Sequence, residues 1–198
     1  MMLDGNGRNN IQNLAIQNPD AFSTFCGNFY KAAVRVYLFG PMGINNADMV
    51  NPDPQPTLFY SPDPLEKGVQ SGDWTEIGAG GGWYLSAVEL SRFFSYLRYD
   101  NDILKPATRH QMNDLSKCPG ADCRMLGWQK PHYGEMGIYY YHTGSLTYGD
   151  DTDVTKRGMR GVVMNFPNNT EVVLLVNSIG PYENVRDLVA DAFDEAWQ

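Results

Sequence analysis

The chain has 198 residues, of which 42% are hydrophobic and 13% aromatic, and its 15 basic and 23 acidic residues give a net charge of −8. This length and apolar content predict one globular domain with a buried core, or one such domain plus an appendage, rather than a disordered chain. The negative charge, without any cluster of Lys or Arg, argues against nucleic acid and anionic membrane surfaces as partners.

No transmembrane helix is expected, because no stretch approaches the ~18 consecutive apolar residues that would span a bilayer. The initial segment, MMLDGNGRNN, also lacks the basic and apolar regions of a signal peptide. The chain is therefore expected to be cytosolic, or else to be a mature or truncated product.

The first part of the chain, residues 1–72, is expected to be irregular or helical. Residues 1–20 are rich in Asn and Gly and show little periodicity. Residues 29–39 (FYKAAVRVYLF) predict a helix that ends at Gly40 and Pro41. The prolines of residues 51–72 predict an irregular surface crossing.

Two helices are predicted next, within the part spanning residues 73–198. Ser86 and Glu89 form an S-x-x-E capping box, in which each side chain satisfies a backbone amide at the helix start. The apolar residues that follow have the i, i+3, i+4, i+7 spacing of one buried face; they are Leu90, Phe93, Phe94 and Leu97. Pro106, which suits the first turn of a helix, begins a second one that reaches about Leu115.

Strands and a closing helix are predicted for the rest of the chain. Residues 136–142, 162–166 and 172–177 are the strand candidates, and the PNNT turn at residues 167–170 joins the last two, because Asn tolerates positive φ. The closing helix is predicted from apolar residues at helical spacing: Val185, Leu188, Val189, Ala192, Phe193 and Trp197. Helices followed by an antiparallel sheet and a closing helix form an α+β arrangement.

The cysteines leave two alternatives open. Cys118 and Cys123 flank a Pro-Gly turn that would bring their thiols together as a small disulfide, or they remain two reduced thiols. No CxxC or HxxxH spacing accompanies them, so a zinc site is not expected. Neither a metal nor any other cofactor is predicted.

His142 is the first chemical candidate, because it precedes Thr143, Gly144 and Ser145 at a predicted strand end. Small residues at a strand edge leave backbone N–H groups accessible to a ligand. A hydroxyl and an imidazole at that edge can bind a carboxylate or assist proton transfer. The alternative is a structural histidine at a strand end.

Three other features have structural explanations that compete with functional ones. The glycine-rich residues 78–83 predict a close backbone approach, since no G-x-G-x-x-G pattern follows a strand. Asp150, Asp151 and Asp153 predict an exposed acidic loop rather than a calcium site. Residues 139–141 (YYY) could stack on a sugar, but tyrosine is also ordinary strand material.

Taken in order, several segments resemble the superfamily of serine β-lactamases, D-alanyl-D-alanine carboxypeptidases and esterases. LFGPMGI resembles its F-x-P-L-G-M signature, and GGGWYLSAVELSRFFSYL resembles its Gly-Gly, Ser-x-x-Asp/Glu-Leu-x-x-Phe helix. ILKPATRHQM, MLGWQ, YYYHTGSL and FPNNTEVVLLVNS resemble the next helix, the Gly-Trp strand, the third catalytic motif and the hairpin after it. The resemblance covers about residues 10–198 and implies a β-lactamase/transpeptidase-like α+β fold, with residues 1–198 as one partial domain.

The resemblance also implies acyl transfer on a peptide, lactam or ester. In the family, the serine of S-x-x-K attacks the carbonyl, a tyrosine of Y-x-N takes part in proton transfer, and K-T-G or H-T-G helps to hold the substrate carboxylate. Carried over, His142, Thr143 and Gly144 are the third motif, and the backbone amide of Ser145 is half of the oxyanion hole. The H-T-G spelling is more like that of D-alanyl-D-alanine peptidases than that of typical β-lactamases.

The first two motifs of the family are missing or altered. No serine is followed by lysine in an S-x-x-K pattern. The family spacing places the Asn of Y-x-N at Asn13, whose amide can still contact a substrate, but Ile11 stands in place of the tyrosine. The chain is therefore expected to be the C-terminal portion of such a hydrolase, inactive alone, with a small-molecule or peptide substrate. The family implies a periplasmic or extracellular location.

The missing amino-terminal part has a structural consequence. In the family it completes the sheet, so this chain is expected to expose an apolar face or an unpaired strand edge. It would then form a homo-oligomer, swap segments or belong to a longer protein. The alternative function is a non-catalytic relative that binds a ligand or forms an oligomer, which Ile11 favours, and a weaker one is a sugar-binding module that uses residues 139–141.

Overall fold

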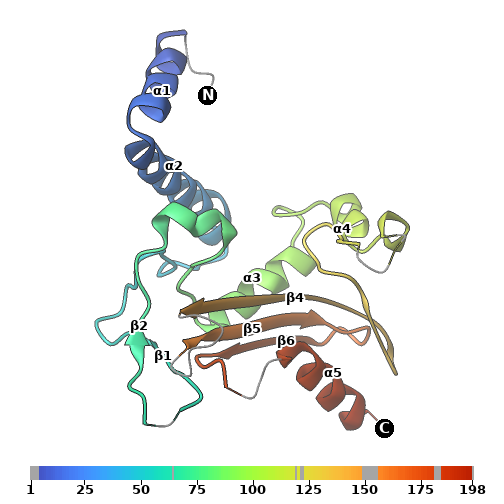
Figure 1. The fold of residues 1–198 in the computed structure, drawn as a ribbon. Helices are drawn as coiled ribbons and strands as arrows, with labels where there is room; N and C mark the ends of the chain where they lie inside the picture. Colours follow the sequence, from blue (N-terminus) through green and yellow to red (C-terminus); the bar gives the residue numbers. More distant parts are fainter. Residues whose placement is uncertain are drawn as a thin grey trace. The chain divides into compact units, whose positions relative to one another are not determined.

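The chain divides into two compact units in a computed structural model, which describes residues 5–63, 65–118, 120, 123–148, 156–180 and 184–197. Unit 1 comprises Met1–Pro56 and Gly72–Leu85, and unit 2 comprises Thr57–Ser71 and Ser86–Gln198. The α-helices and most of the strands are labelled in Figure 1. As expected, no helix in the described ranges is long and apolar enough to cross a membrane. The single partial domain expected over residues 1–198 stays a prediction.

Unit 1 is mainly helical. α1 (Gly5–Gln17) forms in the Asn- and Gly-rich segment that shows little periodicity, and α2 (Pro19–Val34) follows it directly. Asn18 caps α2, because its side chain accepts a hydrogen bond from the N–H of Ala21. A π-helical turn, Arg35–Phe39, continues α2, so the predicted helix over residues 29–39 is confirmed.

Close backbone approaches hold unit 1 together. The 3₁₀ helix Thr75–Gly80 packs against α2. A Cβ atom at Gly27 would collide there with the carbonyl oxygen of Thr75, and a Cβ at Gly78 would collide with the fully buried side chain of Met49. The glycine-rich segment thus serves the close approach that its sequence predicts.

Asp48 accepts hydrogen bonds from several groups of unit 1. Its carboxylate accepts hydrogen bonds from Lys31 Nζ at 3.1 Å and from Arg35 Nη1 at 2.8 Å. The N–H groups of Met49 and Val50 also donate to it. Burial by itself would raise the pKa of Asp48, but these N–H groups and Lys31 outweigh burial and lower that pKa below its usual value.

Unit 2 contains a four-stranded antiparallel sheet in the order β3-β4-β5-β6. Its strands are β3 (His132–Gly134), β4 (Gly137–Tyr148), β5 (Arg157–Asn165) and β6 (Glu171–Val176). A short ribbon of β1 (Leu58–Phe59) and β2 (Val69–Gln70) crosses the proline-rich segment that the sequence predicts to be irregular. Sheet and helices together confirm the α+β class.

Helices α3, α4 and α5 complete unit 2. α3 (Ala87–Tyr99) begins at the predicted capping box, in which Ser86 Oγ accepts from the N–H of Glu89 and the Glu89 carboxylate accepts from the N–H of Ser86. α4 (Pro106–Met112) starts at the predicted proline, and α5 (Val185–Ala196) is the predicted closing helix.

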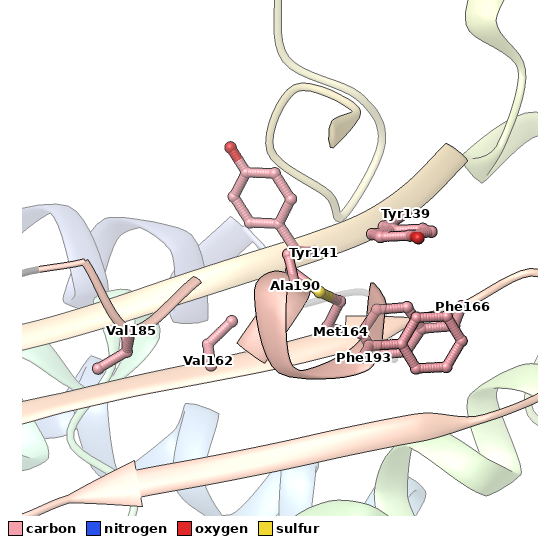
Figure 2. Packing of buried hydrophobic residues seen from close by; sticks show 8 residues of the cluster. All are labelled: Tyr139, Tyr141, Val162, Met164, Phe166, Val185, Ala190 and Phe193. Atoms are coloured by element: carbon pink, nitrogen blue, oxygen red, sulfur yellow. The ribbon is translucent and has the colours of Figure 1, made fainter. Parts of the chain in front are cut away.

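The α5 cluster covers one face of the sheet (Figure 2). Its buried members are Tyr139, Tyr141, Val162, Met164 and Phe166 of the sheet side with Val185, Ala190 and Phe193 of the helix. The rings of Phe166 and Phe193 stack with centroids 3.8 Å apart. Leu188, Ala192 and Trp197, which the spacing predicts to be buried, are exposed, because the sheet covers a narrower stripe of α5.

A second cluster lies on the opposite face of the sheet. Met125, Trp128 and Val163 are buried there, and Leu90 and Phe94 of α3 pack against them. The predicted inner face of α3 is therefore confirmed as a partly buried one.

The β5–β6 hairpin is fastened to α3. Asn169 has φ 65°, the left-handed conformation expected of Asn in this turn. Arg98 Nη2 donates to the carbonyl of Phe166 at 3.3 Å and to Asn169 Oδ1 at 3.2 Å. The same guanidinium pairs with Glu171 at 3.5 Å.

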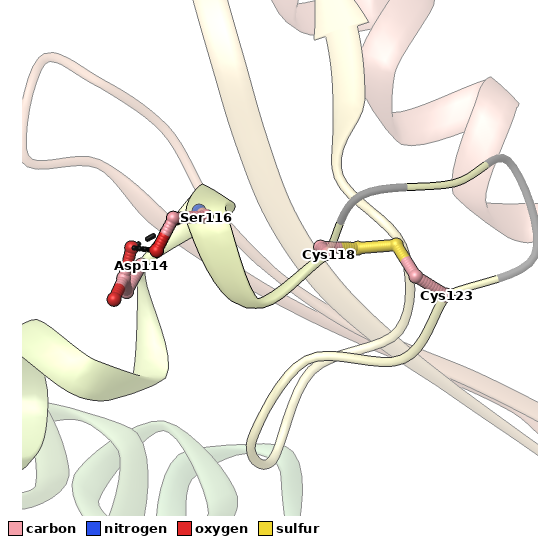
Figure 3. Close-up of a disulfide and its surroundings, with 4 residues drawn as sticks. All are labelled: Asp114, Ser116, Cys118 and Cys123. Carbon is pink, nitrogen blue, oxygen red and sulfur yellow. Dashed lines mark hydrogen bonds between the residues drawn. A yellow bond between two sulfur atoms is a disulfide. The ribbon is translucent and has the colours of Figure 1, made fainter.

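Cys118 and Cys123 form a disulfide, with Cα atoms 5.1 Å apart, which decides between the two alternatives (Figure 3). Nearby, Asp114 Oδ1 accepts from the N–H of Ser116 at 3.0 Å and from its hydroxyl at 2.6 Å, and so caps the 3₁₀ turn Leu115–Lys117. Cys118 also packs against the cluster around Trp128, so the disulfide ties its loop to the second face of the sheet.

Candidate functional site

The His-Thr-Gly triplet lies inside β4, and the prediction that it ends a strand is wrong. β4 pairs with β5 through the triplet and on to Tyr148, which lies opposite Arg157. Local sequence suggested an end at His142, because small residues follow the aromatic run. The backbone of β5 supplies hydrogen-bond partners that no local pattern reveals.

One edge of β4 is open beside the triplet. β3 pairs with β4 only as far as Tyr139, and the N–H of Gln129 donates to the carbonyl of Tyr141 at 2.9 Å. Since the backbone groups of alternate residues point to the same side of a strand, those of Thr143 and Ser145 also face this edge. No backbone partner meets them there in the described part of unit 2. The amide that the resemblance assigns to the oxyanion hole therefore lies on an open edge.

The side chains of the triplet are divided between the two faces of the sheet, because successive residues of a strand alternate. Thr143 and Ser145 share a face with Tyr141, a member of the α5 cluster. His142 lies on the face of Tyr140 and is exposed. The imidazole of His142 and the hydroxyls of Thr143 and Ser145 therefore lie on opposite faces of the sheet. A single ligand group can contact all three only if it approaches along the open edge of β4.

Thr143 and Gly144 are positioned differently. The Thr143 hydroxyl donates to Gln129 Oε1 at 3.1 Å, which joins the Gly-Trp segment to the triplet. A Cβ atom at Gly144 would meet no atom within 4 Å. Packing therefore does not require glycine at this position, and its missing side chain leaves the edge unobstructed.

Arg160 is a candidate site residue that sequence reasoning missed. It lies opposite Ser145 on β5, and its Nη1 donates to Ser145 Oγ at 2.6 Å. Its Nε is buried and has no hydrogen-bond partner among the described residues. No ion pair with a carboxylate of the described residues neutralises it. The guanidinium of Arg160 can form charge-assisted hydrogen bonds with an anionic group placed beside Ser145.

A second arginine stands farther along the same face. Arg186 Nη1 donates to the Tyr141 hydroxyl at 3.1 Å, and its guanidinium lies 5.3 Å from the ring centroid. That hydroxyl points away from the α5 cluster (Figure 2). Burial alone would lower the pKa of Arg186, but its bonds to Tyr141 and Asp187 raise it, so this side chain stays charged. Tyr141, Thr143 and Ser145 thus form a row of hydroxyls flanked by two cations.

Asn13, the predicted member of the second motif, lies on α1 and is exposed. It belongs to unit 1, whereas the triplet belongs to unit 2. Because they belong to different units, the contacts within each unit do not relate Asn13 to the triplet. The role of Asn13 in the site therefore stays a prediction. Ile11 is half-buried on the same helix.

The other sequence candidates add nothing to this site. Asp150, Asp151 and Asp153 lie outside the described residues. Tyr139 and Tyr141 are 0% and 2% exposed, which leaves no free ring face for a sugar. Within the part of the chain that is described, no three His, Cys, Asp or Glu side chains are placed to hold a metal ion.

The order of the motifs and the open edge of β4 are thus the grounds for a functional assignment, and the resemblance to serine hydrolases stays a proposal. No protein-family model, curated protein or solved structure matches the chain.

Proposed function

We propose that this chain is the C-terminal portion of a β-lactamase-related serine hydrolase, and that the open edge of β4 is one wall of its acyl-transfer site. The observation that carries the proposal is the edge itself: beside the His-Thr-Gly triplet, the backbone groups of Thr143 and Ser145 meet no backbone partner among the residues of unit 2 that the structure describes. An extended substrate can pair with such an edge as an added strand.

The chemistry of this wall is the stabilisation of charge. The N–H of Ser145 donates to the substrate carbonyl oxygen as negative charge develops on it. The Ser145 hydroxyl and Arg160 hold a substrate carboxylate through charge-assisted hydrogen bonds. The nucleophile and its base belong to the S-x-x-K and tyrosine motifs, which this sequence lacks, so the chain alone binds without turnover.

Proline substitution tests the amide directly. The N–H of Ser145 points away from β5, so Ser145→Pro removes it without breaking the β4–β5 ladder. An isotope-labelled chain titrated with N-acetyl-D-alanyl-D-alanine is expected to show shifts at the Thr143 and Ser145 amides. Binding should be lost in Ser145→Pro and only weakened in Ser145→Ala, which loses the hydroxyl but retains the N–H.

Thr147→Pro is the matched control, because it removes the next outward amide of the same edge. Binding that falls equally in Ser145→Pro and Thr147→Pro would indicate a general loss of strand structure. Unchanged binding in Ser145→Pro would contradict the role given to this amide.

A second candidate function is a non-catalytic relative that assembles through its strand edges. Ile11 in place of the tyrosine favours it. Backbone groups alternate in direction along β6 as they do along β4, so those of Val173 and Leu175 point away from β5. In the described part of unit 2 they meet no backbone partner. An open apolar edge of this kind is a template for pairing with another strand.

Covalent labelling separates the two candidates. A fluorophosphonate or fluorescent penicillin probe should leave the purified chain unlabelled under the first proposal, since the nucleophile is missing. Labelling would contradict that inactivity and would also exclude a binding-only role. Self-association by light scattering, lost when Val173→Pro blocks the β6 edge, would favour the second candidate.

A further inference from the structure

A pocket of about 140 Å³ lies in unit 2, apart from the open edge of β4. Residues from α3, α4 and the start of β4 line it, together with the end of β5. Its lining includes Trp128 and Tyr140 from the second face of the sheet, whereas Thr143 and Ser145 belong to the α5 face. An inference about this pocket is therefore independent of the proposed acyl-transfer wall.

The walls of the pocket are aromatic and held in place. Trp128 stacks with Phe94 at 5.8 Å between centroids and lies 6.5 Å from the ring of Tyr140. Trp128 Nε1 donates to Asn113 Oδ1 at 3.1 Å, and the Tyr140 hydroxyl donates to the Asn113 carbonyl at 3.2 Å. One residue thus fixes two rings, and the pocket needs little reorganisation to receive a ligand.

The pocket carries positive charge. Arg98 and Arg109 are in its lining, and no Asp or Glu is. Arg98 is paired with Glu171. Among the described residues, the partners of Arg109 are uncharged groups, namely the carbonyls of Asp100 at 2.6 Å and Leu104 at 2.5 Å and the side chain of Asn101.

Neutral carbonyls orient a guanidinium without cancelling its charge. Arg109 is half-buried and has no ion pair with a carboxylate in the described ranges. Its field in this partly desolvated place is screened less than at an exposed surface. A negative group placed at the pocket is therefore favoured over a neutral or positive one.

We propose that this pocket binds a small flat ring that carries a carboxylate, such as an aromatic monocarboxylate. An apolar cavity of about 150 Å³ takes one benzene ring, so the volume of this pocket suits a single ring. The ring packs against the half-buried side chains of Phe94 and Tyr140, beside the buried Trp128, and the carboxylate faces Arg109. The pairing of an aromatic wall with one uncompensated cation selects this chemistry over purely apolar ligands.

The four tryptophans of the chain provide an internal comparison in spectra of the 198-residue protein. Titration with benzoate is expected to shift the indole N–H signal of Trp128 saturably, while Trp74, Trp83 and Trp197 stay unchanged. Benzyl alcohol, which has the ring without the charge, and acetate, which has the charge without the ring, should each bind about ten-fold more weakly or worse.

Two variants separate ring binding from charge binding. Ile138→Trp fills the pocket and should abolish the benzoate response. Arg109→Gln keeps a hydrogen-bond donor but removes the charge, and should reduce benzoate affinity to that of benzyl alcohol. Arg124→Gln, which removes an exposed cation outside the lining, is the matched control and should change nothing.

Three results would overturn the proposal. The first is the absence of a saturable shift at Trp128 up to the solubility limit of benzoate. The second is equal binding of benzoate and benzyl alcohol to the parent chain. The third is an unchanged benzoate response in Ile138→Trp, and this outcome remains informative even if Arg109→Gln fails to fold.

Discussion

Replacing Phe193 by Ala is the sharpest test of the α5 cluster. Phe193 is 8% exposed, stacks on Phe166 with centroids 3.8 Å apart, and contacts Tyr139 edge-on at 5.6 Å. Truncating a buried Phe to Ala costs about 3–5 kcal/mol, since apolar contact is lost and a cavity is left. The two ring pairs contribute about 0.5–1.5 kcal/mol each, which places the expected loss toward the upper end of that range.

Leu188→Ala is the matched control on the same helix. Leu188 is 51% exposed, so its truncation should change stability by no more than about 0.5 kcal/mol. Urea unfolding followed by far-ultraviolet circular dichroism gives both free energies of unfolding. A loss below about 1 kcal/mol for Phe193→Ala, or a larger loss for Leu188→Ala, would refute the assignment of the buried face.

Three further predictions concern other parts of the chain. The pKa of Asp48 is lowered from its usual 3.8, so the stabilisation that its carboxylate provides is present at neutral pH and is lost as the pH falls through the pKa of the folded state. Asp48→Asn should therefore flatten the acid limb of the unfolding free energy of unit 1, and an unchanged limb would contradict this. Asn169→Ala should be less stable than Asn169→Gly by about 1 kcal/mol in thermal unfolding, because both variants lose the same side-chain hydrogen bond and only Ala is strained at positive φ. Equal stability of the two variants would argue against a positive φ at this position. An alkylating reagent should label only the exposed Cys26 before reduction, and mass spectrometry that finds every cysteine labelled without reductant would contradict the disulfide. Reducing the Cys118–Cys123 disulfide, which closes a short loop, should lower the free energy of unfolding by about 2 kcal/mol.

Local signals in the sequence placed several elements correctly. The capping box at Ser86 marks the start of α3, and Pro106 marks the start of α4, because both act through backbone groups within one turn of a helix. Asn169 marks the β5–β6 turn for the same kind of reason, since tolerance of positive φ is a property of a single residue.

The errors arose where distant segments decide the outcome. The Asn- and Gly-rich start shows little periodicity and was expected to be irregular or helical, and the structure shows that α1 forms there and packs against α2. Six apolar positions indicated the buried face of α5, but the sheet covers only part of that width and leaves Leu188 and Trp197 exposed. Period and propensity give the type of an element, whereas its neighbours determine how far it extends and which side chains are buried.

The candidate site shows the same division. The sequence by itself determined that His142, Thr143, Gly144 and Ser145 are contiguous, that no S-x-x-K accompanies them, and that the closing segments form an α+β arrangement. Only the tertiary structure decided that the triplet lies within a paired strand, that its other edge is open, and that Arg160 reaches Ser145. Strand register and edge exposure depend on which backbones meet, and residues far apart in the chain set that pairing.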